Sequence, residues 1–315
     1  MKHNVSAVAL IGPGRIGQAL GKLLADAGVR IEWIAARRPS AARAAARFIG
    51  SGRAVTLPAG VQASSLPVVV RASSLPRPRR QDACTTTASI LLLTTSDSAL
   101  PEVAQFLAAQ CTDWKGRVVL HTSGGWPAGG ESSVLQPFRL RGASAASLHP
   151  LQTVPSREAG VRNLIGCFWA VEGDPKAVRL ARRWVRLLRG HTLTIAPQRK
   201  AAYHAAAVIA CAGVVTLMEN AERLMNLSGV ERSQARKMLA GFVSETAANF
   251  GRLGGRRSLT GPASRGDWAT IRKHQAALRS EAPDLVPLYR ELLRSMLKLA
   301  RGTRAATRSP CSGAL

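Results

Sequence analysis

Residues 5–17 read V-S-A-V-A-L-I-G-P-G-R-I-G, an apolar run that leads directly into glycines spaced G-x-G-x-x-G. The run predicts a buried strand, and residues 16–27 predict the helix that follows it. At such a junction the first glycine permits a tight turn, the second lets a pyrophosphate approach the backbone, and the third lets helix and strand pack closely. The stretch therefore predicts the start of a Rossmann-type dinucleotide-binding domain, with the cofactor against Gly12, Pro13, Gly14, Arg15, Ile16 and Gly17.

The second predicted strand, at residues 29–36, is followed by a basic stretch. Proteins that bind NAD place Asp or Glu about 20 residues after the glycines, where the carboxylate accepts a hydrogen bond from the ribose. Here Arg37, Arg38 and Ser40 occupy that region, and Glu32 lies too early, inside the strand. Guanidinium groups make paired hydrogen bonds to phosphate oxygens, so the sequence predicts NADP in preference to NAD. The alternative is that an arginine-rich chain places arginine here by composition alone.

The remaining sequence changes character near residue 198. Before it, apolar runs alternate with alanine-rich helical stretches, the βαβ pattern of a parallel sheet. After it, helical periodicity continues without strand signals. We therefore predict an α/β protein, with an N-terminal Rossmann-type parallel sheet at residues 1–197 and a C-terminal all-helical domain at 198–301. The segment 63–82, in which A-S-S-L-P occurs twice, is predicted to be a disordered insertion, and 302–315 a disordered tail.

The chain is strongly basic, with 44 Lys and Arg against 18 Asp and Glu and a formal net charge of +26. Binding to nucleic acid is one interpretation, but the cations are spread along the chain and aromatic residues, which stack on bases, make up only 4%. We expect small anionic molecules, not nucleic acid, as partners. The longest apolar run, near residues 90–93, is far shorter than the ~20 residues that span a bilayer, so we expect a cytoplasmic protein without membrane contact. The five cysteines form no C-x-x-C pair, so neither a metal site nor disulfides are expected.

Polar residues follow three of the predicted strands, at the edge where an open α/β sheet binds its ligands. We expect Thr95 and Asp97 to contact the cofactor. His149 is a candidate proton donor, although a structural or capping histidine is an equal alternative. The backbone amides around Ser123 and Gly124 are candidates to hold a substrate carboxylate or a ribose. The predicted substrate-binding residues of this stretch are His121, Ser123 and Gly124.

Two further candidates lie in the predicted helical domain. Lys200 and His204 are four residues apart, so they share one face of a helix and can protonate a carbonyl or imine as hydride arrives. The alternative is a solvated lysine beside a buried structural histidine. Arg265 is a candidate to bind a substrate carboxylate through both guanidinium nitrogens; alternatively it pairs with Asp267 and fixes a connection between helices.

Five short blocks together resemble one family. They read I-G-P-G-R-I-G, H-T-S-G, S-L-H-P-L, Y-H-A-A-A and L-T-G-P-A-S-R-G-D, at residues 11–17, 121–124, 147–151, 203–207 and 259–267. From about residue 5 to residue 300 the chain resembles the Rossmann-like proteins that carry the domain of unknown function 2520 (DUF2520). This family is related to the group of ketopantoate reductase, pyrroline-5-carboxylate reductase and β-hydroxyacid dehydrogenase.

The resemblance implies an NAD(P)-binding N-terminal domain and a helical C-terminal domain for substrate binding or dimerisation, so we expect a homodimer. In the β-hydroxyacid dehydrogenases a catalytic lysine is followed one turn later by asparagine. Lys200 falls in the place of that lysine, and His204 replaces the asparagine. The family also implies a Pro-Asp pair after one strand, where this chain has Ser96 and Asp97.

Two functions follow from these observations. The first is an NADP-dependent oxidoreductase that transfers a hydride to a small carbonyl or imine substrate bearing a carboxylate. In that function Lys200 or His204 donates the proton, while Arg265 and Ser123 orient the substrate. The second is a non-catalytic NADP-binding protein that senses redox state or acts as a scaffold for a partner.

Overall fold

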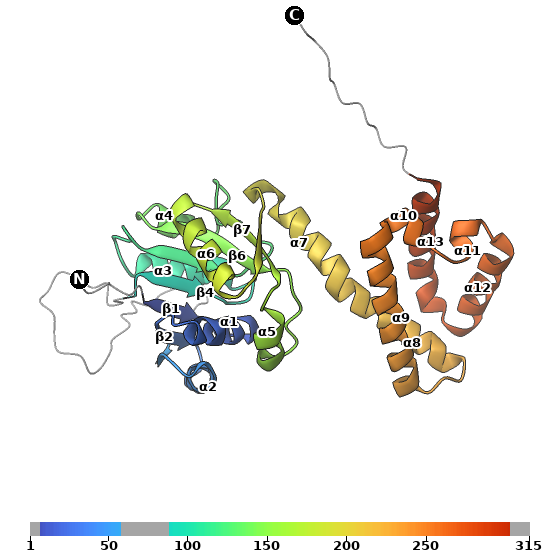
Figure 1. The fold of residues 1–315 in the computed structure, drawn as a ribbon, viewed down its shortest axis with the longest axis horizontal. Helices are drawn as coiled ribbons and strands as arrows, with labels where there is room; N and C mark the ends of the chain where they lie inside the picture. The colour runs from blue at the N-terminus through green and yellow to red at the C-terminus, as the bar shows by residue number, and fades with distance from the viewer. Residues whose placement is uncertain (1–6, 58–87, 303–315) are drawn as a thin grey trace, which may run out of the picture. The chain divides into compact units, whose positions relative to one another are not determined.

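The computed structural model of the protein describes residues 7–57 and 88–302. The chain divides into two compact units, Met1–Ile209 and Ala210–Leu315, which we call the sheet unit and the helical unit (Figure 1). The predicted insertion at 63–82 lies outside the described residues, as does the predicted tail from residue 303 onward.

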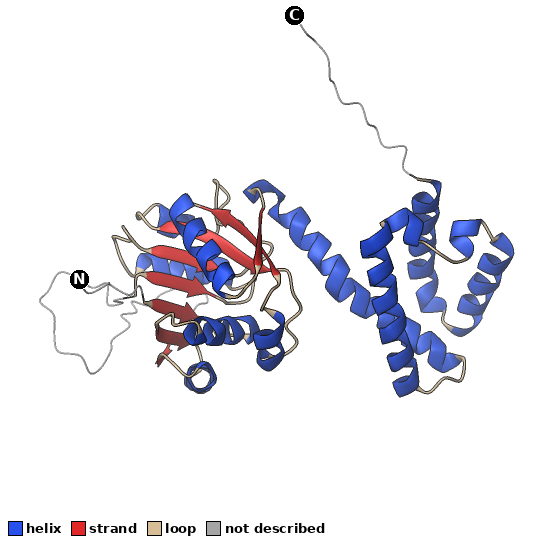
Figure 2. Cartoon of the chain, viewed as in Figure 1, coloured by secondary structure: helices blue, strands red, loops and turns tan. Residues whose placement is uncertain are grey.

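The sheet unit is built on one largely parallel sheet, drawn in red in Figure 2. Its strands within the described residues follow the order β3-β2-β1-β4-β5-β6-β7-β8. Neighbouring strands are parallel except for β6 and β7, which pair antiparallel. This confirms the predicted α/β class. The strands are β1 (Val8–Ile11), β2 (Ile31–Ala36), β3 (Arg53–Thr56), β4 (Ile90–Leu93), β5 (Val118–His121), β6 (Ser144–Pro150), β7 (Phe168–Gly173) and β8 (His191–Thr194).

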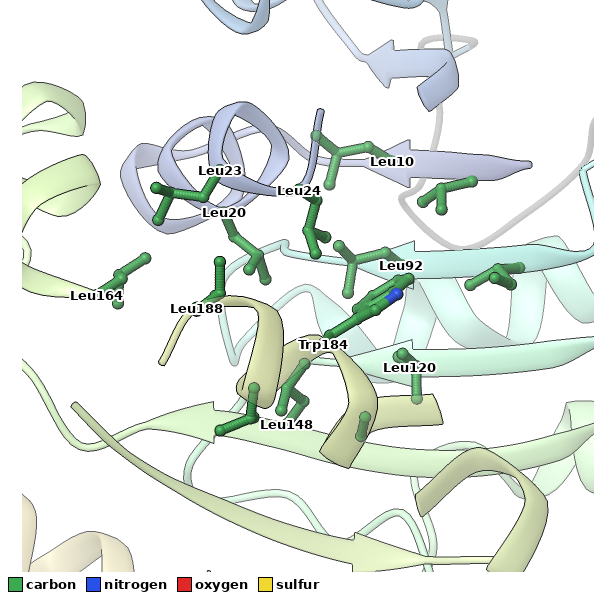
Figure 3. Packing of buried hydrophobic residues seen from close by; sticks show 14 of the residues in the cluster. Leu10, Leu20, Leu23, Leu24, Leu92, Leu120, Leu148, Leu164, Trp184 and Leu188 are labelled. Atoms are coloured by element: carbon green, nitrogen blue, oxygen red, sulfur yellow. The ribbon is translucent and has the colours of Figure 1, made fainter. Parts of the chain in front are cut away.

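Helices cover both faces of this sheet, as parallel strands buried on both sides require. One hydrophobic cluster includes Leu20, Leu24 and Trp184, which pack against Leu10, Leu92 and Leu120 of the sheet (Figure 3). A second cluster on the opposite face contains Leu100, Leu107 and Phe138. The helices are α1 (Arg15–Asp26), α2 (Pro39–Ile49), α3 (Leu100–Ala109), α4 (Gln136–Arg139), α5 (Arg157–Asn163) and α6 (Pro175–Leu187), followed by the 3-10 turn η1 (Pro197–Arg199) and α7 (Lys200–Val208).

The helical unit follows a π-helical turn, η2 (Ile209–Gly213), at the boundary between the units. Its buried clusters are small: Ala263, Ile271 and Leu293 form one, and Leu278, Ala282 and Leu285 form another. Its described elements are α8 (Val214–Leu227), α9 (Arg232–Leu253), α10 (Gly255–Ser258), α11 (Pro262–Arg265), α12 (Trp268–Glu281), η3 (Pro283–Leu285) and α13 (Val286–Arg301). The predicted all-helical C-terminal part is thus confirmed.

One helical run in the described part of the chain is both long and apolar. The run Pro197–Leu227, which joins η1, α7, η2 and α8, is 31 residues long, and its most apolar window has a mean hydropathy of 1.8 with none of it buried. Among the described residues, this run alone is long and apolar enough to cross a membrane, by length and composition only.

Candidate active site

The candidate site lies at one edge of the sheet. Strands β1, β4, β5 and β6 are parallel neighbours, so their carboxyl ends meet at the same edge. The residues that follow these ends are the glycine turn after β1, Thr94 to Asp97 after β4, and Ser123 to Gly125 after β5. His149 is the next-to-last residue of β6 itself. The topology therefore places the predicted cofactor turn and the predicted polar clusters along one edge.

The glycine turn has the geometry that a dinucleotide pyrophosphate requires. Gly12 has a φ of +70°, and a Cβ there would overlap the Thr95 side chain. A Cβ on Gly17 would overlap the Thr94 hydroxyl, which itself donates to the Gly12 carbonyl at 2.9 Å. The helix α1 begins after the exposed Gly14, without a side-chain cap and without an acidic residue in its first turn. Its first amides therefore face an anion-binding position that no side chain of the helix fills.

The residues expected at the adenosine end of the cofactor are exposed. Arg37 and Arg38 lie between β2 and α2, and Ser40 lies in the first turn of α2. No acidic residue stands in the first turn of α2. Since β2 neighbours β1 in the sheet, these side chains lie on the same edge as the glycine turn. All three exposed side chains are cationic or polar, and none of them is acidic.

The loop after β5 holds itself in shape through its own hydrogen bonds. The Ser123 amide donates to Nδ1 of His121 at 3.1 Å, and the Ser123 hydroxyl accepts from the amides of Gly125 and Trp126. The Trp126 indole donates to the Asp97 carbonyl at 2.8 Å, which ties this loop to the loop after β4. Several amides proposed from the sequence as a carboxylate cradle are therefore already engaged, so the loop forms the rigid floor of the site.

Three ring side chains stand over this floor. Nδ1 of His149 lies 2.9 Å from the Tyr203 hydroxyl, and the ring centroids of His149 and His204 are 5.6 Å apart. A Cβ on Gly124 would come within 2.7 Å of Nε2 of His149 and 2.6 Å of Cδ2 of His204. A glycine is therefore needed at this position for the two imidazoles to approach the loop. We call His149, Tyr203 and His204 the ring cluster.

Burial sets the protonation of two members of this cluster. Burial, followed by the positive charge of Lys200 and then by His204, lowers the pKa of His149 to about 3. Burial raises the pKa of Tyr203 to about 12. At neutral pH the imidazole of His149 is thus neutral and the phenol keeps its proton, so the pair can share one hydrogen bond in either direction.

The Lys200 side chain is buried, whereas His204 on the next turn of the same helix is half-buried. Lys200 is only 1% exposed, its ammonium lies 3.3 Å from the carboxylate of Glu172, and it also donates to the Ser147 hydroxyl. Burial lowers the pKa of Lys200, and the charge of Glu172 opposes that shift. Lys200 is therefore neither solvated nor directed at a substrate position. It forms a buried ion pair with Glu172 beneath the ring cluster.

The remaining predicted residues are placed as follows. Thr95 and Asp97 lie in the loop after β4, and His121 is fully buried at the end of β5, where burial holds its pKa well below the usual range. Arg265 is the exposed last residue of α11 in the helical unit. Asp267, its alternative partner, caps α12 by accepting from the Thr270 amide at 3.1 Å.

Sequence reasoning missed three residues that the structure brings to this edge. Tyr203 stood beside His204 in a quoted block but received no role. Glu172 lies within an apolar strand, and a buried acid there signals a buried cationic partner. Trp126 follows two glycines in a loop, and no sequence signal marks its contact with Asp97.

Comparison with known structures gives extensive likeness over the whole chain. The chain is 20% identical to an NADP oxidoreductase candidate from Bacteroides fragilis, with a TM-score of 0.67 over 93% of this chain and 98% of that one. It is 22% identical to a protein from Thermotoga maritima, with a TM-score of 0.62 over 94% and 98%. It is 15% identical to the reductive aminase from Aspergillus terreus, crystallised with NADPH and ethyl levulinate, with a TM-score of 0.61 over 95% and 98%. At these identities the likeness establishes the fold.

Two family models match successive parts of the chain. A search of curated proteins finds no match. The Rossmann-like domain matches residues 1–150, and the domain of unknown function DUF2520 matches residues 167–296. The first range holds the glycine turn and His149, and the second holds Glu172 and the start of α7. The chain therefore carries a Rossmann-like domain followed by a DUF2520 domain, which confirms the resemblance found in its sequence.

Proposed function

We propose that the protein is an NADP-dependent oxidoreductase that reduces a small carbonyl or imine compound. The observation that carries the proposal is the hydrogen-bonded pair of His149 and Tyr203, which stands at the same strand-end edge as the glycine turn. A binding protein needs the turn alone, whereas reduction also needs a proton source at the edge where ligands of such sheets bind. The excess of cations favours an anionic substrate, such as one that bears a carboxylate.

The glycine turn and the first amides of α1 would hold the pyrophosphate, and Arg37, Arg38 and Ser40 would hold the 2′-phosphate. A reduced nicotinamide bound in this way supplies a hydride. Reduction of C=O to CH–OH, or of C=N to CH–NH, then requires one proton on the heteroatom. Tyr203 donates that proton, and His149 orients the phenol and stabilises the phenolate by donating from Nδ1. His204 borders the same space above Gly124 and Gly125.

This assignment replaces the direct proton transfer from Lys200 that the sequence suggested. A side chain that is 1% exposed and engaged by Glu172 and Ser147 has no path to a substrate atom in this conformation. The ring cluster, by contrast, is half-buried and borders the loop floor.

The deciding experiment is calorimetric titration of the protein with NADPH and, separately, with NADH. We expect at least a tenfold preference for NADPH, which Arg37→Ala combined with Arg38→Ala abolishes. A matched control is Arg43→Ala combined with Arg47→Ala, on the same helix α2 but beyond its first turn. Equal or absent binding of the two nucleotides would overturn the cofactor assignment. Binding without reduction of any keto acid, ketone or imine would leave a sensor or scaffold instead.

We further propose that a second copy of this chain covers the exposed apolar side chains of α8 and α9 in the helical unit. Val215 of α8 is 64% exposed, and Phe242 and Phe250 of α9 are 71% and 62% exposed. The helical unit has only small buried clusters of its own, so burying these side chains against an identical face would supply the core that it lacks. Lys200 belongs to the same helical run, Pro197–Leu227, as α8, and its side chain is anchored inside the sheet unit, which favours a protein surface over a bilayer as the cover.

A further inference from the structure

The buried pair Lys200–Glu172 joins three segments that are distant in sequence. Glu172 lies on β7 in register with Ser147 of β6, and Ser147 lies in register with His121 of β5. These residues form a polar row on one face of the sheet, and each is at most 3% exposed. Lys200, the first residue of α7, closes this row from above.

Glu172 uses both carboxylate oxygens to hold the loop that forms the floor of the site. One oxygen accepts from the Ala128 amide at 2.8 Å, and the other accepts from the Gly129 amide at 2.9 Å. Ser147, the other partner of Lys200, donates to the Ser123 carbonyl at 3.3 Å. The network therefore fixes both ends of the loop stretch on which Gly124 and Gly125 lie.

Lys200 fixes the other side of the site. Tyr203 and His204 follow it by three and four residues, so they lie one turn further along the same side of α7. Anchoring the Lys200 ammonium inside the sheet unit sets both the height and the rotation of that first turn. A shift of either would separate Tyr203 from His149, which lie 2.9 Å apart.

We propose that Lys200 and Glu172 are positioning residues, which lock the first turn of α7 to the loop floor and so hold the ring cluster in place. The catalytic role of this pair rests on the proposed function. Its effect on the geometry of the ring cluster does not, and it can be tested without a substrate. The positive charge of Lys200, which helps to keep His149 neutral, supports it independently.

The test uses the full-length protein without nucleotide and three variants, Lys200→Met, Glu172→Gln and the double variant. Lys22→Met is the matched control, because it removes an exposed ion pair with Asp26. The six histidines are labelled with ¹³C in their rings, and His149 is assigned by its replacement. The measurements are the titration midpoint of His149 and the nuclear Overhauser contact between His149 and Tyr203.

In the wild type and in Lys22→Met we expect His149 to stay neutral down to about pH 4, since its pKa is about 3, and the contact with Tyr203 to be strong. In the double variant, which leaves no unpaired buried charge, we expect cooperative melting, a midpoint raised by at least one pH unit, and loss of the contact. Where a substrate is reduced, kcat falls at least tenfold while the Kd for NADPH stays within twofold.

Cooperative melting with an unchanged midpoint and an unchanged contact would overturn the proposal and leave the pair as a stabilising element only. Should the Met and Gln variants fail to fold, Lys200→Arg decides instead, because it keeps the charge but changes the reach; an unaltered ring cluster in that variant would equally overturn the proposal. These readouts do not involve nucleotide or turnover. Failure of NADPH binding or of reduction would therefore contradict the proposed function without affecting them.

Discussion

The Tyr203 hydroxyl and Nδ1 of His149 lie 2.9 Å apart, although the two residues are separated by 54 positions in sequence. The phenol comes from the first turn of a helix, and the imidazole comes from the end of a central strand. A neutral imidazole can either accept from the phenol or donate to its oxygen. The contact therefore survives transfer of the phenol proton, which is the property that a proton donor needs.

Replacement of Tyr203 by phenylalanine should lower kcat on the order of 10²-fold, because it removes the proton source but keeps the ring. The Kd for NADPH should not change. Steady-state kinetics on a reduced substrate and calorimetry on the nucleotide measure the two effects. Tyr289→Phe is a close control, since the Tyr289 hydroxyl also lies 2.9 Å from a histidine, His274, in the helical unit. An unchanged kcat in Tyr203→Phe would exclude the phenol as the donor.

Stability should fall as the pH drops from about 6.5 toward 3. The pKa of His149 is about 3 in the folded protein, and that of His121 is also well below its ordinary value. The unfolded chain, in which histidine has a pKa of about 6.5, therefore binds more protons in this window, and each histidine costs up to about 1.4 kcal/mol per pH unit. Urea unfolding at several pH values measures this slope. His149→Gln should flatten this slope, and a slope insensitive to His149→Gln would contradict the assignment.

Removing one member of the buried ion pair should be costly. Lys200→Met leaves the Glu172 carboxylate buried without its cation and should lower the free energy of unfolding by about 3–5 kcal/mol. The double variant with Glu172→Gln should recover part of that loss. Lys22→Met, at an exposed pair, should change stability by less than about 1 kcal/mol. If Lys200→Met behaves like Lys22→Met in denaturant unfolding, the pair is not buried in solution.

A side chain at Gly17 should impair nucleotide binding. A Cβ there would overlap the Thr94 hydroxyl, so Gly17→Ala must push α1 away from the strand ends that position its first amides. We expect the Kd for NADPH to rise at least tenfold, with partial recovery when Thr94→Ala is added. Gly241→Ala in α9 meets no atom within 4 Å and should raise stability by about 0.5–1 kcal/mol. Unchanged affinity in Gly17→Ala would show that the turn does not hold the nucleotide.

Charges on the exposed apolar face should prevent self-association. Light scattering after gel filtration should give the mass of two chains for the wild type and of one chain for Phe242→Glu combined with Val215→Glu. Leu140→Glu is the control, because Leu140 is 75% exposed but lies in the sheet unit. A wild-type monomer would contradict the proposed homodimer. Protein recovered only with lipid or detergent would instead indicate a membrane as the cover.

Much of this fold could be predicted because its signals are local. The apolar run before Gly12 and the glycine spacing are properties of consecutive residues, and so is the loss of strand signals after residue 198. Strand β3 was not predicted, since its four residues, Arg53–Thr56, are exposed or partly buried and lack an apolar run. Four short helices were also not predicted, because four to seven residues hold too few turns to show helical periodicity. They are α4, α5, α10 and α11.

The site was harder to predict because its geometry depends on register. His149 and His204 could be named from the sequence as titratable residues near strand and helix ends. That Lys200 turns inward follows from the pairing of Ser147 with Glu172 across antiparallel strands, and no local pattern encodes that pairing. For the same reason Tyr203 received no role, although it lies beside His204.

The buried lysine also has a consequence for the order in which the protein is made. All described strands of the sheet precede Lys200 in the chain, and a polypeptide leaves the ribosome from its N-terminus. The Glu172 carboxylate, the Ser147 hydroxyl and the loop amides that Glu172 binds can therefore assemble before Lys200 has been synthesised. A nascent chain halted just short of this residue would carry a finished nucleotide turn but no phenol, so the capacity to bind would precede the capacity to react.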